Sequence, residues 1–330
     1  MIRIAVDAMG GDSAPKITVE GAMKAVKQFD DIEVTLFGDE AAIKEYLTND
    51  ERISIVHCTD YFRMDEADIA FQIRKRKETS LVKAMEGCQK GDYDAIVSAG
   101  TTAGLVAGGT LVVKRIPGFN RPALGPIIPQ TDGGAMVFLD AGANTECKPE
   151  WLLQFAQIAS IYQEKVAGIE NPRVGLLNNG TEDQKGRELE QTTYQLLKDS
   201  GLNFVGNIEG KEILSGACDV LVTDGYTGNI ALKTIEGVAK AVSVVLKREL
   251  KSNVRGMLGG LIAKKNLGNM RQLFDAKRIG GAVLFGCNSV VIKAHGSSDE
   301  VAFMNAIRQA RKTVQNEVIP TIKSVINKES

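Results

Sequence analysis

Short loops rich in Gly, Ser, Thr and Asn end several apolar runs of this sequence, and a helix-like segment follows each loop. Backbone N–H groups at the first turn of a helix are free to donate, and the helix dipole adds positive potential there. The repeated pattern therefore predicts that the protein binds phosphate or another oxyanion. The loops are residues 7–12, 98–104, 178–181, 224–229 and 295–298.

Lys185 follows the loop 178–181 and is expected in the first turn of a helix over residues 183–198. The helix dipole disfavours a cation at that end unless an anion shares the site. Lys185 is therefore a candidate anion contact. The alternative is a capping box from Thr181 to Gln184, which needs no ligand.

Two glycines and Asn229 follow Asp224 and open a long helix-like segment, a pattern that fits a bound oxyanion. A plain turn would use the same residue types, and this alternative stays open. Asp7, at the end of the first strand-like run, is equally suited to hold its loop or to contact a substrate.

The loop 295–298 lies between a strand-like run and a helix start. His295 or Ser297 would line a pocket in the functional interpretation. In the alternative, Ser297 and Glu300 form a capping box, and His295 is merely satisfied by its neighbours.

Familiar catalytic and nucleotide-binding motifs are absent from the sequence. It contains no G-x-G-x-x-G, G-x-x-x-x-G-K-[ST], G-x-S-x-G or H-E-x-x-H. Only His57 and His295 are histidines, which excludes a His-rich metal site; His57 is expected to be structural or on the surface. The cysteines form no C-x-x-C pair and are expected to be small buried side chains: Cys58, Cys88, Cys147, Cys218 and Cys287.

The composition is that of an ordinary globular chain, with 330 residues of which 44% are hydrophobic and 25% charged. A formal net charge of −1 and only 5% aromatic residues argue against nucleic-acid binding. The sequence shows no signal-peptide pattern and no run of about 18 apolar residues. A cytoplasmic location is expected, and contact with a membrane surface stays open.

Strand-like runs alternate with helical patterns from the first residue. This alternation predicts one compact α/β domain over residues 1–330, with a largely parallel sheet covered by helices. Functional loops are then expected at the carboxyl ends of the strands. The predicted strands are residues 2–6, 32–37, 53–57, 95–98, 136–139, 173–177, 204–205, 220–223 and 290–294, and the predicted helices are residues 15–29, 41–47, 80–89, 149–166, 183–198 and 300–318.

Residues 226–278 are longer than an ordinary crossover helix, and their two apolar stripes predict a helical arm. Residues 247–278 carry nine basic side chains against Glu249 and Asp275, a local charge of +7. One interpretation is a helical hairpin that packs against a second subunit, with its lysines solvated. The other adds a tip whose apolar residues enter the interface of an anionic membrane.

Seven stretches of the sequence together resemble the bacterial PlsX family, the acyl-carrier-protein:phosphate acyltransferases of phospholipid synthesis. They occur in order and cover nearly the whole chain apart from the basic arm. Thr101, the order Ala103-Gly104 and Asn179 depart from the family pattern. The stretches are IAVDAMGGDSAPK (4–16), YDAIVSAGTTAG (93–104), IPGFNRPALGPIIP (116–129), LDAGANTECKPEWLLQFA (139–156), NPRVGLLNNGTEDQKG (171–186), NFVGNIEGKEILSGACDVLVTDGYTGNIALKT (203–234) and VVIKAHGSSDEVAFMNAIRQA (290–310).

The resemblance implies a three-layer α/β/α fold like that of phosphotransacetylases and isopropylmalate dehydrogenases, with a protruding helical arm. It implies a homodimer without cofactor or metal that transfers a long acyl chain from acyl carrier protein to inorganic phosphate. The acyl phosphate would pass to a membrane glycerol-phosphate acyltransferase, so a peripheral position on the membrane is expected.

Phosphate is itself a nucleophile, and a thiolate is a good leaving group, so the reaction needs position and charge stabilisation more than a covalent intermediate. The expected catalytic residues are Lys185, Asn229 and His295. The expected phosphate or substrate contacts are Asp7, Gly10, Gly11, Ser98, Gly100, Thr101, Asn178, Gly180, Asp224, Thr227, Gly228 and Ser297.

The carrier protein is acidic, so a basic docking surface is expected. Residues 74–83 supply one, opposed locally only by Glu78, and a solvated helix face is the alternative. The predicted docking residues are Arg74, Lys75, Arg76, Lys77 and Lys83.

Two other functions compete with acyl transfer. A nicotinamide-dependent decarboxylating dehydrogenase needs clustered metal carboxylates and an arginine set for a hydroxyacid, and the sequence shows neither. A non-catalytic membrane scaffold would depend entirely on the basic arm.

Overall fold

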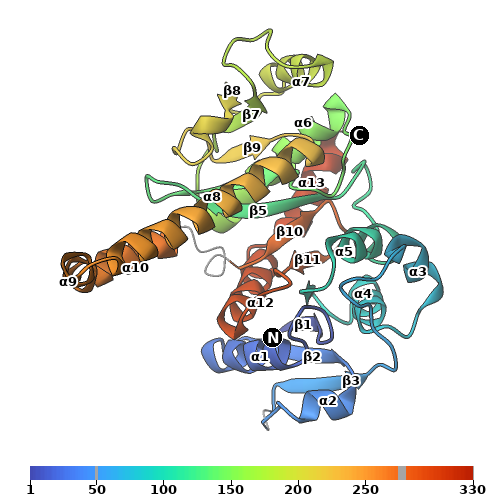
Figure 1. Cartoon of the computed structure of the whole chain (residues 1–330). Helices are drawn as coiled ribbons and strands as arrows, with labels where there is room; N and C mark the ends of the chain where they lie inside the picture. Colours follow the sequence, from blue (N-terminus) through green and yellow to red (C-terminus); the bar gives the residue numbers. More distant parts are fainter. Residues whose placement is uncertain (49–50, 274–279, 330) are drawn as a thin grey trace.

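A computed structural model describes residues 1–48, 51–273 and 280–329 of the chain (Figure 1). Within these residues, eleven strands form one sheet in the order β3-β2-β1-β4-β11-β10-β5-β6-β9-β7-β8. The strands are β1 (Ile2–Asp7), β2 (Ile32–Gly38), β3 (Ile53–His57), β4 (Ala95–Ser98), β5 (Ala123–Pro129), β6 (Ala135–Leu139), β7 (Val174–Asn178), β8 (Phe204–Glu209), β9 (Val220–Val222), β10 (Ala282–Phe285) and β11 (Val290–Lys293).

Helices connect and cover these strands. In chain order they are α1 (Lys16–Gln28), α2 (Glu40–Lys44), α3 (Ile69–Lys75), α4 (Ser80–Lys90), α5 (Thr102–Gly108), the π-helix η1 (Gly109–Val113), α6 (Pro149–Tyr162), the π-helix η2 (Gln163–Ala167), α7 (Glu188–Lys198), the 3₁₀ turn η3 (Gly210–Glu212), α8 (Gly225–Lys251), α9 (Val254–Ile262), α10 (Lys264–Leu273), α12 (Glu300–Gln315) and α13 (Val318–Glu329).

Both faces of the sheet are buried, which explains the apolar runs in the sequence. Along β1, Ile4 and Val6 pack with residues of α1 and α12, whereas Ala5 packs with residues of α4. In the other half of the sheet, Val220 and Val222 of β9 face the cluster that contains α6, and Leu221 between them faces a separate cluster that reaches α8. This alternation makes three layers, as expected for an α/β/α fold.

The centre of the sheet differs from the prediction, because β5 and β10 were not predicted as strands. Both are antiparallel to their neighbours: β10 pairs with β11 and β5, and β5 pairs with β6. The other seven pairings are parallel. Pro126 lies inside β5. Because proline is rare in a central strand, the sequence pattern did not indicate a strand here.

Two predicted helices have different ends in the structure. The helix expected over residues 183–198 begins only at Glu188, because Gly186 has a left-handed φ of +88° that no helix accommodates. The helix expected over residues 300–318 stops at Gln315, and Glu317, with a φ of +51°, separates it from α13.

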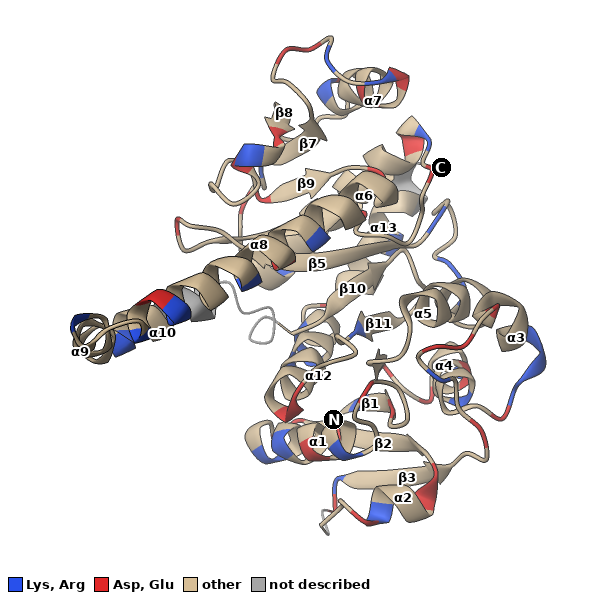
Figure 2. Cartoon of the chain, viewed as in Figure 1, with Lys and Arg blue, Asp and Glu red and all other residues tan. Residues whose placement is uncertain are grey.

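Helices α8, α9 and α10 extend away from the sheet, and α9 and α10 lie at the far end (Figure 1). Figure 2 shows basic residues gathered toward that end. The residues of this predicted arm beyond 273 lie outside the described residues. Within the described part of the chain, no helix is both long and apolar enough to cross a membrane.

Candidate functional site

A cavity of about 730 Å³ lies where the N-terminal and C-terminal halves of the sheet meet. Its walls come from the loop before α5, from β5, from the first half of α8 and from the segment that joins β11 to α12. Parts of the chain that are far apart in sequence therefore build one site, at the carboxyl ends of β4 and β11. This is where ligands bind in open α/β sheets.

The end of the cavity at the carboxyl ends of β4 and β11 is polar, whereas β5 and α8 contribute most of the apolar lining residues. The polar lining residues include Asp12, Thr101, Asn229, Lys233, Lys293, His295 and Ser297. The apolar lining residues include Leu124, Ile127, Ile128, Leu214, Leu232 and Ile235. Such a division suits a ligand with one charged group and one hydrocarbon part.

Gly100, Thr101, Asn229, His295 and Ser297 are the predicted site residues that line this cavity. Thr101 caps α5, because its Oγ1 accepts a hydrogen bond from the N–H of Gly104 at 3.1 Å. The remaining predicted contacts and Lys185 are not among the residues that line it within the described part of the chain.

Asp7 holds two of the predicted loops together. Its carboxylate accepts hydrogen bonds from Ser80 Oγ at 2.6 Å and Ser98 Oγ at 2.7 Å, and the residue is only 3% exposed. Burial raises the pKa of this carboxyl, although the two serine hydrogen bonds act against the shift. A Cβ atom at Gly10 would lie 2.6 Å from Asp7 Oδ2 and 2.7 Å from the nitrogen of Gly100, so the loops meet where only glycine fits. Asp7 thus holds the loops together, and its predicted contact with substrate stays a prediction.

Gly11 belongs to the same loop and has a left-handed φ of +115°, which side chains rarely adopt. The next residue, Asp12, donates its N–H to the carbonyl of Gly296 at 2.9 Å. This bond joins the loop after β1 to the loop after β11, and it places Asp12 in the cavity wall.

The first turn of α8 is locked by backbone packing and by an ion pair. Asp224 caps the helix, since its carboxylate accepts from the N–H of Thr227 at 2.9 Å and from the Thr227 hydroxyl at 2.8 Å. Arg187 donates to the same carboxylate at 2.5 Å. Burial alone would raise the pKa of Asp224, but these hydrogen bonds hold it below its ordinary value. A Cβ at Gly228 would lie 1.9 Å from the carbonyl oxygen of Asp140, so a close helix–strand approach requires this glycine.

His295 and Ser297 form a small turn in the cavity wall. Ser297 donates its backbone N–H to His295 Nδ1 at 3.2 Å, and its hydroxyl lies 2.9 Å from the same nitrogen. Burial, followed by the nearby charge of Lys293, lowers the pKa of His295. The imidazole is therefore neutral near neutral pH, with its proton on Nε2. The predicted capping box from Ser297 was wrong, because Asp299 caps α12 by accepting from the N–H of Ala302 at 2.9 Å.

Lys185 lies in the loop before α7 and not in its first turn, so the dipole argument for this residue was wrong. Its ammonium is 4.0 Å from a carboxylate oxygen of Glu182, and its stem lies beside Gly180. Asn178 bridges this loop, because its amide donates to the carbonyl of Lys185 at 3.1 Å and to the side chain of Asn207 at 3.0 Å. The predicted capping box from Thr181 is also absent, since residue 181 precedes the helix by seven positions.

Lys293 is the main lining residue that the sequence analysis missed. It ends β11, its ammonium donates to the carbonyl of Ala294 at 2.5 Å, and burial lowers its pKa to about 8. A lysine as the last residue of a run of buried β-branched residues was the available signal. Lys233 and Asp12 were missed as well.

The predicted docking surface carries less free charge than expected. Arg76 pairs with Asp60 at 2.5 Å and with Glu66, and Lys83 pairs with Glu78 at 2.6 Å. The expectation that only Glu78 opposes this patch was wrong, because the fold brings Asp60 and Glu66 to it. Arg74 and Lys75 at the end of α3, and Lys77 just after it, stay exposed, and no ion pair forms to them from the described residues.

All five cysteines are free thiols, four of them buried and Cys147 partly buried. Burial raises the pKa of Cys58 to about 11 and that of the other four thiols to about 12. A thiolate nucleophile is therefore disfavoured at neutral pH. Among the residues that the structure describes, no group of His, Cys, Asp or Glu side chains is arranged to hold a metal ion.

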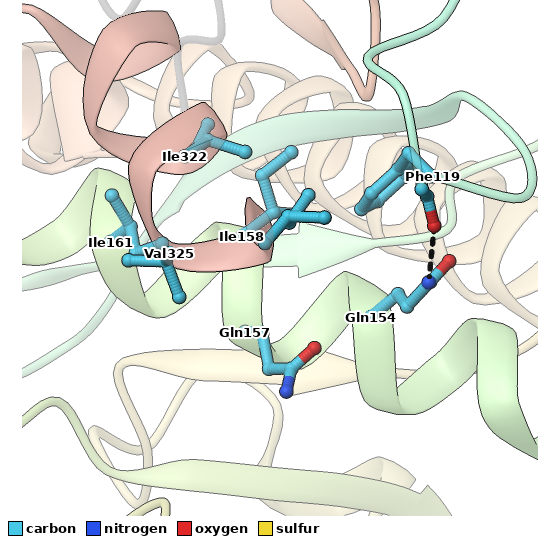
Figure 3. A pocket seen from close by; sticks show the side chains of 9 residues that line it. Phe119, Gln154, Gln157, Ile158, Ile161, Ile322 and Val325 are labelled. Atoms are coloured by element: carbon cyan, nitrogen blue, oxygen red, sulfur yellow. Dashed lines mark hydrogen bonds between the residues drawn. The ribbon is translucent and has the colours of Figure 1, made fainter. Parts of the chain in front are cut away.

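A second, smaller cavity of about 190 Å³ lies between α6 and α13 (Figure 3). Its lining is mostly apolar, with Phe119, Ile158 and Ile322 close together, and Gln154 donates to the carbonyl of Gly118 at 2.9 Å. No titratable side chain lines it. The larger cavity is therefore the candidate functional site.

Comparison with known proteins identifies close sequence relatives. A protein-family model described as "Fatty acid synthesis protein" matches residues 2–321. The phosphate acyltransferase of Geobacillus sp. (strain WCH70) is 49% identical over 98% of this chain and 98% of its own length. The phosphate acyltransferase of Bacillus cereus (strain B4264) is 49% identical over 100% of this chain and 99% of its own length.

Solved structures with the same fold are more distant in sequence. A phosphotransacetylase from Streptococcus pyogenes superimposes with a TM-score of 0.61 at 20% identity, covering 96% of this chain and 94% of that one. A branched-chain phosphotransacylase from Enterococcus faecalis V583 gives a TM-score of 0.60 at 14% identity, covering 95% and 99%. The expected phosphotransacetylase-like fold is confirmed.

Proposed function

The chain belongs to the family of fatty acid synthesis proteins and is a phosphate acyltransferase. We propose that it transfers a long acyl chain from the thioester of acyl carrier protein to inorganic phosphate, and that the reaction takes place in the 730 Å³ cavity. The products are an acyl phosphate and the free carrier thiol. The observation that supports this site is the union of a polar, cationic end with an apolar wall in one cavity.

The apolar side of the cavity suits the acyl chain. Ile128 of β5 belongs to the same apolar cluster as Leu232 and Ile235 of α8, and all three line the cavity. Burying each methylene between such side chains is worth about 0.8 kcal/mol. The chain would therefore lie between β5 and α8, with its thioester directed to the polar end.

The reaction needs no covalent enzyme intermediate. A phosphate oxygen attacks the thioester carbon, the carbonyl electrons move onto oxygen, and the C–S bond breaks as they return. The leaving thiolate has an ordinary pKa of about 8.5, so it departs without a strong acid. The protein must hold the phosphate and stabilise the oxyanion.

His295 is suited to meet the oxyanion, because its Nδ1 accepts from Ser297 and no acceptor among the described residues is hydrogen-bonded to its Nε2 proton. The amide of Asn229, in the second turn of α8, lies across the same cavity. Lys185 stays a predicted catalytic residue: it lies two positions before Arg187, which bonds to the cap of α8.

The carrier protein would dock on the basic end of α3. Arg74, Lys75 and Lys77 are exposed there, and Phe71, 59% exposed, adds an apolar contact beneath the ammonium of Lys75 at 4.2 Å. An acidic helical protein is attracted to such a surface.

The arm formed by α8–α10 would make a homodimer and contact a membrane. Val238, Val242 and Val245 lie on one face of α8 and are exposed, which suits packing against a second copy. At the far end, Leu261 and Ile262 are 69% and 85% exposed beside basic residues, which suits the interface of an anionic bilayer. The protein would then sit peripherally on the cytoplasmic face, where a glycerol-phosphate acyltransferase receives the acyl phosphate.

The decisive experiment mixes the purified chain with long-chain acyl carrier protein and inorganic phosphate, and traps the product with hydroxylamine. We expect acyl hydroxamate and free carrier thiol in equal amounts, both dependent on phosphate. Hydroxylamine also attacks thioesters, so the reaction without phosphate is the control. Hydroxamate and carrier thiol no higher than in this control would show the donor or the acceptor to be wrong.

A further inference from the structure

Lys233 and Lys293 line the cavity, and only one of the two ammonium groups has a carboxylate partner. The ammonium of Lys233 lies 2.8 Å from a carboxylate oxygen of Glu236 on the next turn of α8. The ammonium of Lys293 donates instead to the neutral carbonyl of Ala294 at 2.5 Å, and no carboxylate of the described residues lies within ion-pair distance of it. Lys293 thus brings an unbalanced positive charge to the cavity.

The position of Lys293 is set by the sheet. It is the last residue of β11 and pairs in register with Ser98 at the end of β4. The next residue, Ala294, donates its N–H to the carbonyl of Ser98 at 2.9 Å, so the two strand ends are locked together. Gly100, Thr101 and His295 line the cavity from these same two strand ends. The ammonium therefore lies at the carboxyl ends of two paired central strands, which form a rigid support.

The charged groups around Lys293 leave room for an anion. Asp12 and Lys233 act on it from the loop after β1 and from α8, with opposite signs, while Glu236 also lines the cavity but is paired with Lys233. His295 is neutral near neutral pH. Lys293 is partly buried, and a desolvated cation without an ion-pair partner is costly, so an incoming dianion would reduce that cost.

We propose that the ammonium of Lys293 is the cationic contact for inorganic phosphate, and that it holds the ion beside His295 at the polar end of the cavity. This inference rests on the proposed acyl transfer, and it adds a substrate-binding residue to it. Phosphate bound at Lys293 has its attacking oxygen next to the imidazole that meets the carbonyl of the thioester.

The inference has a consequence for pH, since only the protonated amine binds an anion. Burial lowers the pKa of Lys293 to about 8, and a bound phosphate would raise it again. At a saturating thioester, the kcat/KM for phosphate reports the enzyme–thioester complex before phosphate binds, so it should fall about tenfold per pH unit above a pH of about 8. The KM for the acyl carrier protein should not follow this curve.

The test measures initial rates against phosphate concentration at a saturating thioester, across the alkaline range. In Lys293→Met, which keeps the apolar stem, we expect kcat/KM for phosphate to drop by about 10²-fold with little change in the KM for the thioester. In Lys293→Arg, the charge persists, so the alkaline fall should disappear from the accessible range. The matched control is Lys44→Met, an exposed lysine paired with Glu40 on α2, which should behave as wild type.

Two results would overturn the inference while leaving acyl transfer intact. One is a Lys293→Met variant that makes acyl phosphate with a wild-type KM for phosphate and a wild-type pH profile. The other is a wild-type kcat/KM for phosphate that stays flat well above pH 8, which decides the question even if the methionine variant does not fold. A wild-type chain that forms no acyl phosphate would instead refute the proposed function itself.

Discussion

The imidazole of His295 has its chemistry fixed by two neighbours. Ser297 donates its backbone N–H to Nδ1, which leaves the proton on Nε2, and burial together with the charge of Lys293 keeps the ring neutral. A neutral imidazole is a poor acid for a thiolate but a suitable hydrogen-bond donor to a developing oxyanion. Its role in the proposed reaction is therefore electrostatic.

Replacing His295 tests this role directly. His295→Ala removes the donor, and we expect kcat to fall by about 10²–10³-fold with the KM for phosphate little changed. His295→Gln supplies an amide N–H at a similar reach and should recover part of the loss. Ser297→Ala keeps the backbone N–H that sets the tautomer, so its effect should be smaller. Equal kcat values for wild type and His295→Ala would refute the assignment.

At the level of elements, α3 and α4 show that tertiary contacts decide which side chains of a basic segment form ion pairs. The sequence presents residues 74–77 as an unbroken basic run. In the fold, Arg76 turns back to Asp60 and Glu66, and only Arg74, Lys75 and Lys77 keep exposed, unpaired charge within the described part of the chain. Docking strength should therefore depend on these three residues and not on Arg76, which stabilises the loop before α3.

Charge reversal on α3 tests the docking surface. We expect Arg74→Glu/Lys75→Glu to raise the KM for acyl carrier protein by about tenfold, because attraction to the acidic carrier protein is replaced by repulsion. A small acyl thioester that lacks the carrier should be used equally well by wild type and variant. The control is Lys16→Glu/Lys27→Glu on α1, which makes the same charge change on the opposite face of the sheet. If both double variants raise the KM alike, the effect belongs to net charge and not to docking.

For the whole molecule, the uneven distribution of charge and apolar surface is the main feature. The chain has a formal net charge of −1, yet the described part of the arm carries Lys247, Arg248, Lys251, Arg255, Lys264 and Lys265 as exposed basic residues. Exposed Leu258, Leu261 and Ile262 lie among them on α9. A basic surface with apolar side chains at the end of an arm, away from the cavity, matches a peripheral membrane contact (Figure 2).

The membrane contact is tested by flotation with vesicles of anionic phospholipid. Leu261→Ser/Ile262→Ser should abolish binding at moderate salt, while Val205→Ser, an exposed apolar residue on β8, should bind as wild type. Sedimentation should show the tip variant with the same oligomeric mass as wild type, and turnover with soluble substrates checks that its cavity is intact. Vesicle binding that survives the double change would place the membrane contact elsewhere.

Sequence alone determined the described strands other than β5 and β10, the major helices and the chemical class of the loops. Strands buried on both faces must be continuous apolar runs, so β1, β2, β4 and β9 could be predicted from hydropathy. Glycines such as Gly10 and Gly228 were visible too. Their physical reason is a close backbone approach, which the sequence does not distinguish from an anion site.

Tertiary structure alone decided which polar residues meet. Asp12, Lys233 and Lys293 come from three distant segments, and only the pairing of β11 with β4 and the crossing of α8 bring them into one cavity. The carboxylates of Asp7 and Asp224, predicted as substrate contacts, accept hydrogen bonds from Ser98 and Thr227. Secondary structure can be predicted from the local hydropathy pattern, because the preference for a helix or a strand depends on a few neighbouring residues. The burial of a side chain and its charge partners depend on the packing of the whole chain.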